Sequence, residues 1–397
     1  MNPRILVPLA ILLVLGARSG ADAVVLKNGK VLGLPDSVKD ENDTIKITPE
    51  NFRTYLKESK GDIVTDGYSG IEFQRSASAK KESVPRDQIA DYDYLGRPDS
   101  LDDGSNQMQA GNFAQAIGTL REVTQDANAR EVFKIEAEFR IGLCLVQSGN
   151  LPGAIKHFAG WKYVTSVYTP QIHSIVAQIH RQGREFAKAR EAYGAMEKLP
   201  DLPTPLLYAA RLGQVDVDIA ERKFDAAGAS LRQITSQMGA DPALTDPRAQ
   251  AQVLLAKLLL ESQSKERYAE ARIGLEAARD LRGLSAPTAA AVYASLGDMI
   301  YAMGDPEAAR FAYMRVVCMY PDEGGLVAHA LRNAGQCFLD LALRAEKTDM
   351  AASDEFLKQG VLLLQECMGK FRASGSAKEA NAAYSKVKDR YEKLTAK

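Results

Sequence analysis

The sequence predicts a mostly α-helical protein, in which an α-α superhelix follows a small β-barrel-like module. Three observations lead to this prediction. An apolar segment opens the chain, residues 24–98 alternate apolar and polar side chains between turn-forming residues, and residues 99–375 repeat one helical pattern. The 397 residues are 46% hydrophobic and 25% charged, which is the composition of a folded protein long enough for more than one unit.

Residues 1–23 are predicted to be a signal peptide. Arg4 supplies the positive charge that opens such a peptide, and residues 5–16 form its apolar segment. Ala21 and Ala23 then give the small-x-small pattern that signal peptidase reads. The 12 apolar residues are too few to cross a hydrocarbon core of about 30 Å. We therefore expect cleavage after Ala23 and an exported protein, either periplasmic or extracellular.

Residues 24–98 are predicted to form a small β module. Asn28-Gly29 is a strong hairpin signal, because both residues tolerate the positive φ of a tight turn. Alternating segments follow at 44–47 and 70–74, and residues 84–89 close the module. The pattern resembles the small SH3-like β modules that open many exported bacterial repeat proteins, which implies a barrel-like fold.

Residues 99–375 repeat a helical pattern. In each copy an alanine follows a turn, a large apolar residue comes four positions later, and a second apolar residue three positions after that. These spacings place the three residues on one helical face, where the small alanine lets two helices approach closely. The alanines are Ala116, Ala154, Ala189, Ala227, Ala271 and Ala309, and the last apolar positions are Val123, Trp161, Met196, Ile234, Ala278 and Val316.

One copy of the pattern, at residues 293–321, carries further markers. They are Tyr293, Leu296, Gly297, Ile300, Ala309, Tyr313 and Pro321. This set resembles the tetratricopeptide repeat, a helical hairpin that stacks on its neighbours because it cannot bury its apolar face alone. The resemblance implies a solenoid of about seven hairpins. Residues 376–397 are polar and rich in lysine, as expected of a helix that caps such a stack.

The resemblance also implies a binding surface, because the first helices of such hairpins line a concave groove that receives a partner peptide or helix. Transferred position by position, the candidate partner-binding residues are Phe139, Leu143, Val146, Ser174, Gln178, Arg181, Asp298, Tyr301, Arg332, Gln336 and Leu339. The first three are apolar, whereas groove residues are more often polar. They either anchor a partner or pack against the β module or the preceding hairpin, and the sequence leaves both interpretations open.

No catalytic, cofactor or metal site is predicted. The sequence contains no glycine-rich phosphate loop, no paired-histidine zinc motif and no nucleophile elbow. His173 and His180 lie on one predicted helical face, but no third ligand is near them. The cysteines are predicted to be buried thiols, with a bridge between Cys318 and Cys337 left open.

The charge balance narrows the kinds of partner. Lys and Arg number 50 against 51 Asp and Glu, so the formal net charge is −1 at pH 7. Binding to nucleic acid or to an anionic membrane normally requires an excess of positive charge, so no nucleic-acid partner is expected. No segment after residue 23 is apolar enough to span a bilayer, so an integral membrane protein is not expected either.

The function expected from the sequence is a non-catalytic scaffold or adaptor that holds other proteins of the cell envelope or periplasm. The alternative is a β module that binds a surface glycan or peptidoglycan and is positioned by the solenoid. Binding rather than catalysis is common to both expectations.

Overall fold

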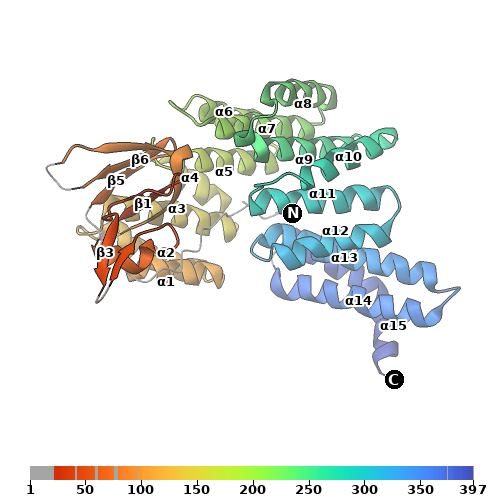
Figure 1. The fold of residues 1–397 in the computed structure, drawn as a ribbon. Coiled ribbons are helices and arrows are strands. Elements are labelled where there is room, and N and C mark those ends of the chain that lie inside the picture. The colour runs from red at the N-terminus through yellow and green to blue at the C-terminus, as the bar shows by residue number, and fades with distance from the viewer. Residues whose placement is uncertain are drawn as a thin grey trace. The chain divides into compact units, whose positions relative to one another are not determined.

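The computed structural model describes residues 22–40, 43–58, 61–75, 79–94, 96–372 and 374–396. Within these ranges the chain forms eight strands, 15 α-helices and four short 3-10 helices (Figure 1). Contacts divide the described residues into two compact units, one of residues 22–176 with 198–203 and the other of residues 177–197 with 204–396. Most of the predicted signal peptide, residues 1–21, lies outside the described residues.

The β module occupies the start of the first unit. Its strands are β1 (Ala23–Leu26), β2 (Val31–Leu32), β3 (Ser37–Asp40), β4 (Asp43–Lys46), β5 (Asp62–Asp66), β6 (Gly70–Gln74), β7 (Glu82–Pro85) and β8 (Ile89–Asp93). The predicted hairpin is confirmed, since β1 pairs antiparallel with β2 and Gly29 has φ 84°. The described strands form three small antiparallel sheets, ordered β2-β1-β8, β3-β4 and β5-β6-β7.

The closed barrel that the SH3-like resemblance implied is not formed by the described strands. The hairpin of β3 and β4 pairs only with itself, and the following segment folds as a 3-10 helix, η1 (Phe52–Glu58), rather than as a strand. The fully buried Phe52 packs with Ala23 and Val25 of β1. Two aromatic side chains from η1, Phe52 and the partly buried Tyr55, therefore pack in the cluster beside β1.

The first described residues already belong to the folded unit. Ala23 is the first residue of β1 and pairs with Asp93 of β8. The Asp22 side chain is fully buried, and its Oδ2 accepts a hydrogen bond of 2.6 Å from the Ile63 amide. The structure thus places ordered contacts two residues before the boundary predicted at residue 24, and the cleavage position stays a prediction.

Two helical hairpins complete the first unit. They consist of α1 (Asp99–Gln109) with α2 (Phe113–Gln125), and of α3 (Glu131–Gln147) with α4 (Leu151–Ala159). Within each hairpin a first-helix glycine faces a large second-helix residue. A Cβ atom on Gly104 would lie 2.7 Å from Leu120, and one on Gly142 would lie 2.3 Å from Phe158. These glycines are therefore positions of close helix–helix approach.

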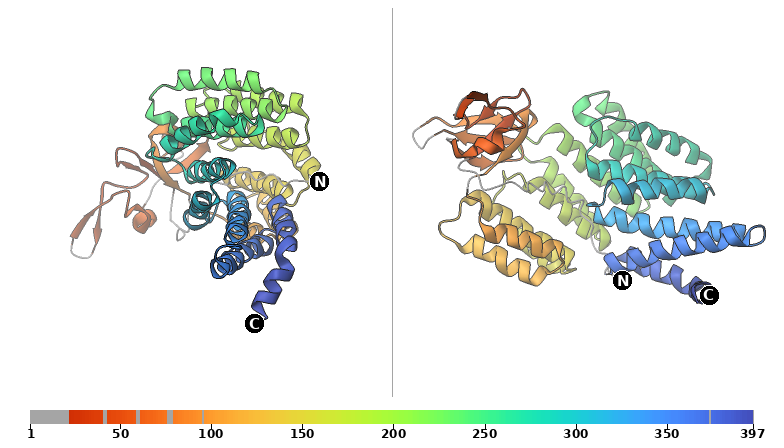
Figure 2. Two further views of the ribbon diagram at one scale, coloured as in Figure 1. Left: turned by 90° about the vertical axis from the view of Figure 1, so that its right-hand side faces the viewer. Right: turned by 60° about the horizontal axis from the view of Figure 1, so that its bottom comes forward.

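The helices α5 (Thr169–Gln182) and α6 (Phe186–Glu197) continue the chain into the second unit. Beyond them, the second unit contains α7 (Thr204–Ala220), α8 (Phe224–Met238), α9 (Thr245–Glu261), α10 (Tyr268–Arg279), α11 (Ala286–Ala302), α12 (Pro306–Met319), α13 (Gly324–Ala345), α14 (Met350–Lys370) and α15 (Gly375–Thr395). Successive helices from α7 to α14 pack as hairpins, and α15 packs against α13 and α14 (Figure 2). None of the described helices combines the length and apolarity needed to cross a membrane.

The core of the second unit consists of overlapping clusters. One joins α7 and α8 to α9, a second joins α9 and α10 to α11, and a third joins α11 and α12 to α13, α14 and α15. Each hairpin therefore buries its apolar face against the next, as in a solenoid. The six pattern alanines are all buried, with exposed fractions of at most 1%, which confirms them as contact positions.

One position departs from the pattern. Trp161 was predicted on a helical face, but α4 ends at Ala159 and Gly160 follows it. Trp161 therefore lies in the loop before α5 and is only partly buried. A glycine directly after a helix is a common stop signal. Gly160 therefore indicated in the sequence that the helix ends before Trp161, although the repeat spacing predicted otherwise.

Candidate functional site

The apolar trio predicted in the groove lies in the core of the first unit. Phe139, Leu143 and Val146 are 7%, 2% and 0% exposed. The Phe139 ring stacks on Tyr168, with ring centroids 4.4 Å apart. Buried side chains cannot contact a partner, so the assignment of these three residues to partner binding was wrong. The structure supports packing, but the residue that stacks on Phe139 directly precedes α5 and belongs neither to the β module nor to the preceding hairpin.

The β module and the loop before α5 are joined through backbone pairing. The amide of Tyr68 donates to the Thr165 carbonyl at 3.2 Å, and the amide of Val167 donates to the Asp66 carbonyl at 3.1 Å. The same loop presents Tyr168 to Phe139. The β module thus helps to position a loop that covers α3.

A partly buried polar cluster adjoins these contacts, because Asp66 belongs to both. Asp66 Oδ2 accepts hydrogen bonds from the Tyr94 hydroxyl at 2.6 Å and the Tyr92 hydroxyl at 3.2 Å, and Arg86 pairs with the other carboxylate oxygen. Burial and the Asp66 charge raise the pKa of both tyrosines, so they remain neutral donors. The Tyr94 ring then contacts Phe133 of α3, with centroids 5.7 Å apart.

The remaining predicted residues, except Ser174 and Leu339, contribute to a polar surface on the second unit. Ser174 belongs to the part of α5 in the first unit, and Leu339 packs against the core beside Ala342 and Leu357. We call the surface the first-helix face. Its residues are Gln178, Arg181, Asp216, Lys257, Asp298, Tyr301, Arg332, Gln336 and Asp340.

One end of the first-helix face is a bridging carboxylate. Asp216 of α7 lies 3.0 Å from the Arg181 guanidinium of α5 and 2.5 Å from the Lys257 ammonium of α9. A single acidic side chain thereby links three first helices. Asp216 and Lys257 were not predicted, because no groove positions were transferred to the hairpins that carry them. In the hairpin of Asp216 the Leu212-Gly213 pair precedes the pattern alanine by 14 residues, whereas Gly297 precedes Ala309 by 12.

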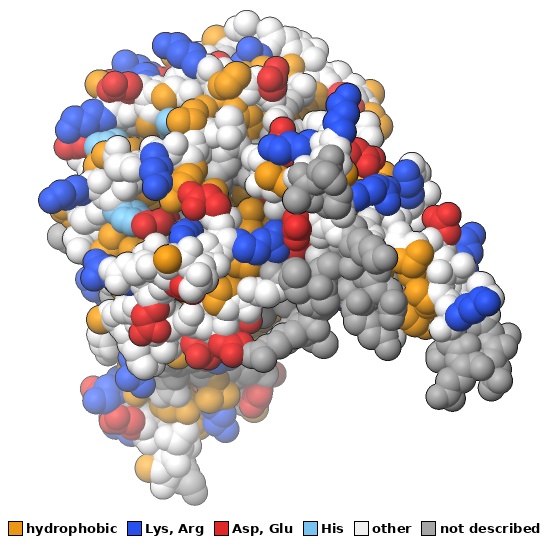
Figure 3. Space-filling view, turned by 90° about the vertical axis from the view of Figure 1, so that its left-hand side faces the viewer, with side chains coloured by type: hydrophobic (Ala, Val, Ile, Leu, Met, Phe, Trp, Pro, Cys, Tyr) orange, Lys and Arg blue, Asp and Glu red, His pale blue; other side chains and the backbone are white. Residues whose placement is uncertain are grey.

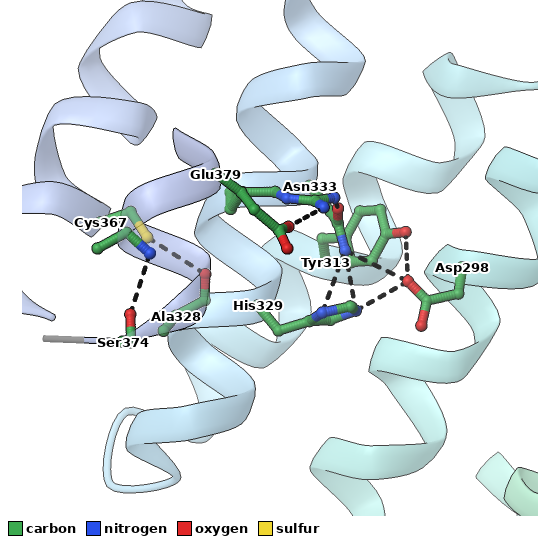
Figure 4. A network of polar contacts seen from close by, with 10 residues as sticks. Asp298, Tyr313, Ala328, His329, Asn333, Cys367, Ser374 and Glu379 are labelled. Atoms are coloured by element: carbon green, nitrogen blue, oxygen red, sulfur yellow. Dashed lines mark hydrogen bonds and ion pairs between the residues drawn. The ribbon is translucent and has the colours of Figure 1, made fainter. Parts of the chain in front are cut away.

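The other end is a hydrogen-bonded network between α11, α12 and α13 (Figure 4). Asp298 Oδ1 accepts from the Tyr313 hydroxyl at 2.8 Å, lies 2.8 Å from His329 Nε2, and accepts from the Asn333 amide at 3.3 Å. Burial and the Asp298 charge raise the pKa of Tyr313. The tyrosine is therefore a fixed donor that orients the carboxylate.

Three further contacts lie beside this network on the surface. Arg332 pairs with Glu379 of α15, and the Tyr301 hydroxyl donates to Asp340 at 2.7 Å. The Gln336 amide donates to the other Asp340 oxygen at 2.8 Å. Four predicted residues, Asp298, Tyr301, Arg332 and Gln336, are thus brought together on the neighbouring helices α11 and α13.

The polar contacts within the first-helix face are weak enough for a ligand to replace them. The exposed fraction is 31% for the Asp298 side chain, 33% for the Arg332 side chain and 37% for residue Tyr301. Ion pairs that are open to solvent typically contribute about 0–1 kcal/mol, so a partner's charged groups can replace them at small cost. Acidic and basic residues alternate along the face, which favours a ligand that offers both donors and acceptors. Basic and acidic side chains are also interspersed over the face of the molecule in Figure 3.

Three of the four cysteines are buried thiols. Burial raises the pKa of Cys144 and Cys367 to about 11 and that of Cys337 to about 12. Cys318 is exposed, contrary to the prediction of a buried thiol, and it is not bonded to Cys337. His180 pairs with Glu185 at 2.5 Å. Among the residues that the structure describes, no group of three potential metal ligands occurs.

Comparisons with known proteins concern the fold. No protein-family model matches the chain, and no curated protein matches it in sequence. A tetratricopeptide repeat protein from Parabacteroides merdae superposes with TM-score 0.35 at 14% identity, covering 66% of this chain and 97% of its own. A Rap protein complexed with Competence and Sporulation Factor gives 0.38 at 13% identity, covering 75% and 98%.

A third solved structure, the P58(IPK) TPR domain, gives TM-score 0.28 at 14% identity, covering 73% of this chain and 79% of its own. At these levels of identity and superposition, the similarity extends no further than the arrangement of helices. The chain is a mostly helical solenoid similar to those of tetratricopeptide repeat proteins.

Proposed function

We propose that this protein is a non-catalytic interaction scaffold of the cell envelope or periplasm that binds a partner peptide or helix along its first-helix face. The observation that carries the proposal is that Asp298, Tyr301, Arg332 and Gln336 lie on adjacent helices, are partly exposed, and are each held by a contact with a neighbouring side chain. Export of the chain is the part of the proposal that rests on the N-terminal sequence alone.

The chemistry of the first-helix face favours binding over catalysis. Asp298 and His329 are residue types that act as acid and base in catalytic sites. The hydroxyl that is hydrogen-bonded to the Asp298 carboxylate belongs to Tyr313, which is only 1% exposed. A nucleophile must reach the substrate, and this hydroxyl does not. The nearest thiol, Cys337, is buried with a raised pKa. Tyr301 and Arg332 instead resemble the aromatic and arginine anchors of binding surfaces.

The proposal is tested with peptides selected from a displayed library on the full-length chain. Binding of the selected peptides is then measured for wild type, for a Tyr301→Ala plus Arg332→Ala variant, and for a matched Phe311→Ala plus Arg279→Ala control. The control also removes an exposed aromatic residue and an arginine, but from α12 and α10. We expect the first variant to lose about tenfold or more in affinity, and the control to bind like wild type.

Circular dichroism and urea unfolding must show that both variants remain folded. Equal affinity of the first variant and wild type, or equal losses in both variants, would contradict the assignment of the first-helix face. Failure of the library to yield any specific peptide would contradict peptide binding itself.

A further inference from the structure

The loop between α4 and α5 forms one wall of a hollow in the first unit. The hollow has a volume of about 380 Å³ and lies against α3 and the end of α4. Trp161, the only tryptophan in the chain, and Tyr163 belong to its lining. A hollow of this size is at the lower end of the range of small-molecule sites, which is roughly 300–1,000 Å³.

The aromatic wall is held in place by hydrogen bonds. The Trp161 indole N–H donates to the Tyr163 carbonyl and to Thr169 Oγ1, both at 3.0 Å. The two rings meet edge to face, with centroids 5.1 Å apart and an interplanar angle of 77°. Because the indole N–H is already paired within the protein, what Trp161 offers to a ligand is ring surface.

The opposite wall is polar. Glu131, Lys134 and Glu138 line the hollow from α3, and their spacings of three and four place them on one helical face. His157 of α4 lies 2.8 Å from the Glu138 carbonyl and 3.5 Å from its carboxylate. Lys162 completes the lining, with its ammonium 5.0 Å from the Tyr163 ring centre.

This combination excludes several classes of ligand. Two carboxylates balance two lysines, so neither a phosphate nor a polyamine meets a complementary charge. A purely apolar ligand would cover polar side chains with which it cannot form hydrogen bonds, which is costly. The lining suits a neutral ligand that has one apolar face and an edge rich in groups that both donate and accept hydrogen bonds.

We propose that this hollow binds a neutral hexopyranose sugar. The C–H face of a pyranose ring would lie on the Trp161 ring with the Tyr163 ring beside its edge, and its hydroxyls would donate to Glu131 and Glu138 and accept from Lys134. Each sugar hydroxyl is donor and acceptor at once, which matches the mixed lining. The site lies on the second hairpin and not on the first-helix face, so it is independent of the peptide-binding proposal.

Intrinsic fluorescence tests this proposal directly, because Trp161 is the single tryptophan and its emission therefore reports on the hollow alone. The full-length chain is titrated with glucose, galactose, mannose, N-acetylglucosamine and their β-linked disaccharides. At least one of these sugars should change the emission saturably at millimolar concentration. Inorganic phosphate and putrescine serve as anionic and cationic probes.

Two variants locate the response. Glu138→Gln removes the negative charge of a proposed acceptor and should weaken sugar binding by about tenfold, since a hydrogen bond to a charged acceptor is stronger than one to a neutral acceptor. Glu122→Gln, on the exposed surface of α2, is the matched control and should bind like wild type. No saturable response to any of the sugars, a response to phosphate or putrescine of equal strength, or equal losses in the two variants would overturn the proposal.

Discussion

The Asp22 carboxylate lies 2.5 Å from the Arg130 guanidinium and is completely buried, so the first described residue of the chain is bonded to the residue that precedes α3. Arg130 also donates to the Ile63 carbonyl of β5 at 3.1 Å. The pair thus connects three segments of the first unit that are far apart in sequence. Removal of Asp22 would leave Arg130 without this carboxylate.

This contact leads to a prediction about processing. We expect the mature chain to begin at Asp22 and not at Val24, because Ser19 and Ala21 also form a small-x-small pattern and cleavage there retains the buried carboxylate. Intact-mass measurement of protein purified from its native host distinguishes the two. A chain beginning at Val24 would contradict the role of Asp22, and a chain retaining Met1 would contradict export.

The pattern alanines give a prediction about packing. Ala189, Ala227 and Ala309 are 0% exposed, so leucine at any of them would overfill a closed contact. We expect each substitution to lower the free energy of unfolding by about 1–3 kcal/mol. Urea denaturation measures the effect. Ala187, which is exposed on α6, provides the control, and its change to leucine should leave the midpoint unchanged.

A buried glutamate predicts a pH dependence. Burial opposes ionisation of Glu136, but hydrogen bonds and charges from Arg97 and Arg140 outweigh it and lower the pKa of this carboxyl. A lowered pKa in the folded state means that stability is present above the unfolded-state pKa and is lost as the pH falls through the folded-state value. The Glu136→Gln variant should have a lower free energy of unfolding than wild type at neutral pH. Its free energy of unfolding should also decrease less than that of wild type as the pH is lowered. Urea midpoints measured from neutral pH down into the acid range test both effects, and parallel curves for variant and wild type would refute the assignment.

The thiols give a prediction about reactivity. Cys318 is exposed, whereas burial raises the pKa of the other three cysteines. A thiolate-selective reagent at neutral pH should therefore label one cysteine in the native protein and all four in urea. Peptide mapping should place the native label on Cys318. Rapid native labelling of Cys337 would contradict its burial.

The solenoid was predictable because its determinants are local. An alanine followed by large apolar residues at spacings of four and three defines a helix contact within a single helix, as at Ala309 and Tyr313. The burial of Phe139 was not predictable in the same way. It depends on Tyr168, which lies in a loop held by the β module, and helical periodicity carries no information on such long-range contacts.

The candidate site was predictable where the repeat kept its markers. Asp298 and Arg332 were found because their hairpins retain glycine at the reference position, as at Gly297 and Gly335. Asp216 was missed because Gly213, the glycine of its hairpin, lies 14 residues before Ala227 and not 12 as in the better-matched hairpins. A spacing argument does not detect a helix whose markers are shifted, but the ion pairs of Asp216 with the neighbouring helices are evident in the structure.

The overlapping clusters of the second unit have a mechanical consequence. Because α9 and α11 each belong to two adjacent clusters, the loss of one cluster removes part of the packing of a helix that the next cluster still holds. Under a stretching force such an array unfolds one segment at a time, because each hairpin interacts only with its neighbours. Pulled from its C-terminus, the protein should extend in successive force peaks that begin with α15, and the refolding order should be the reverse.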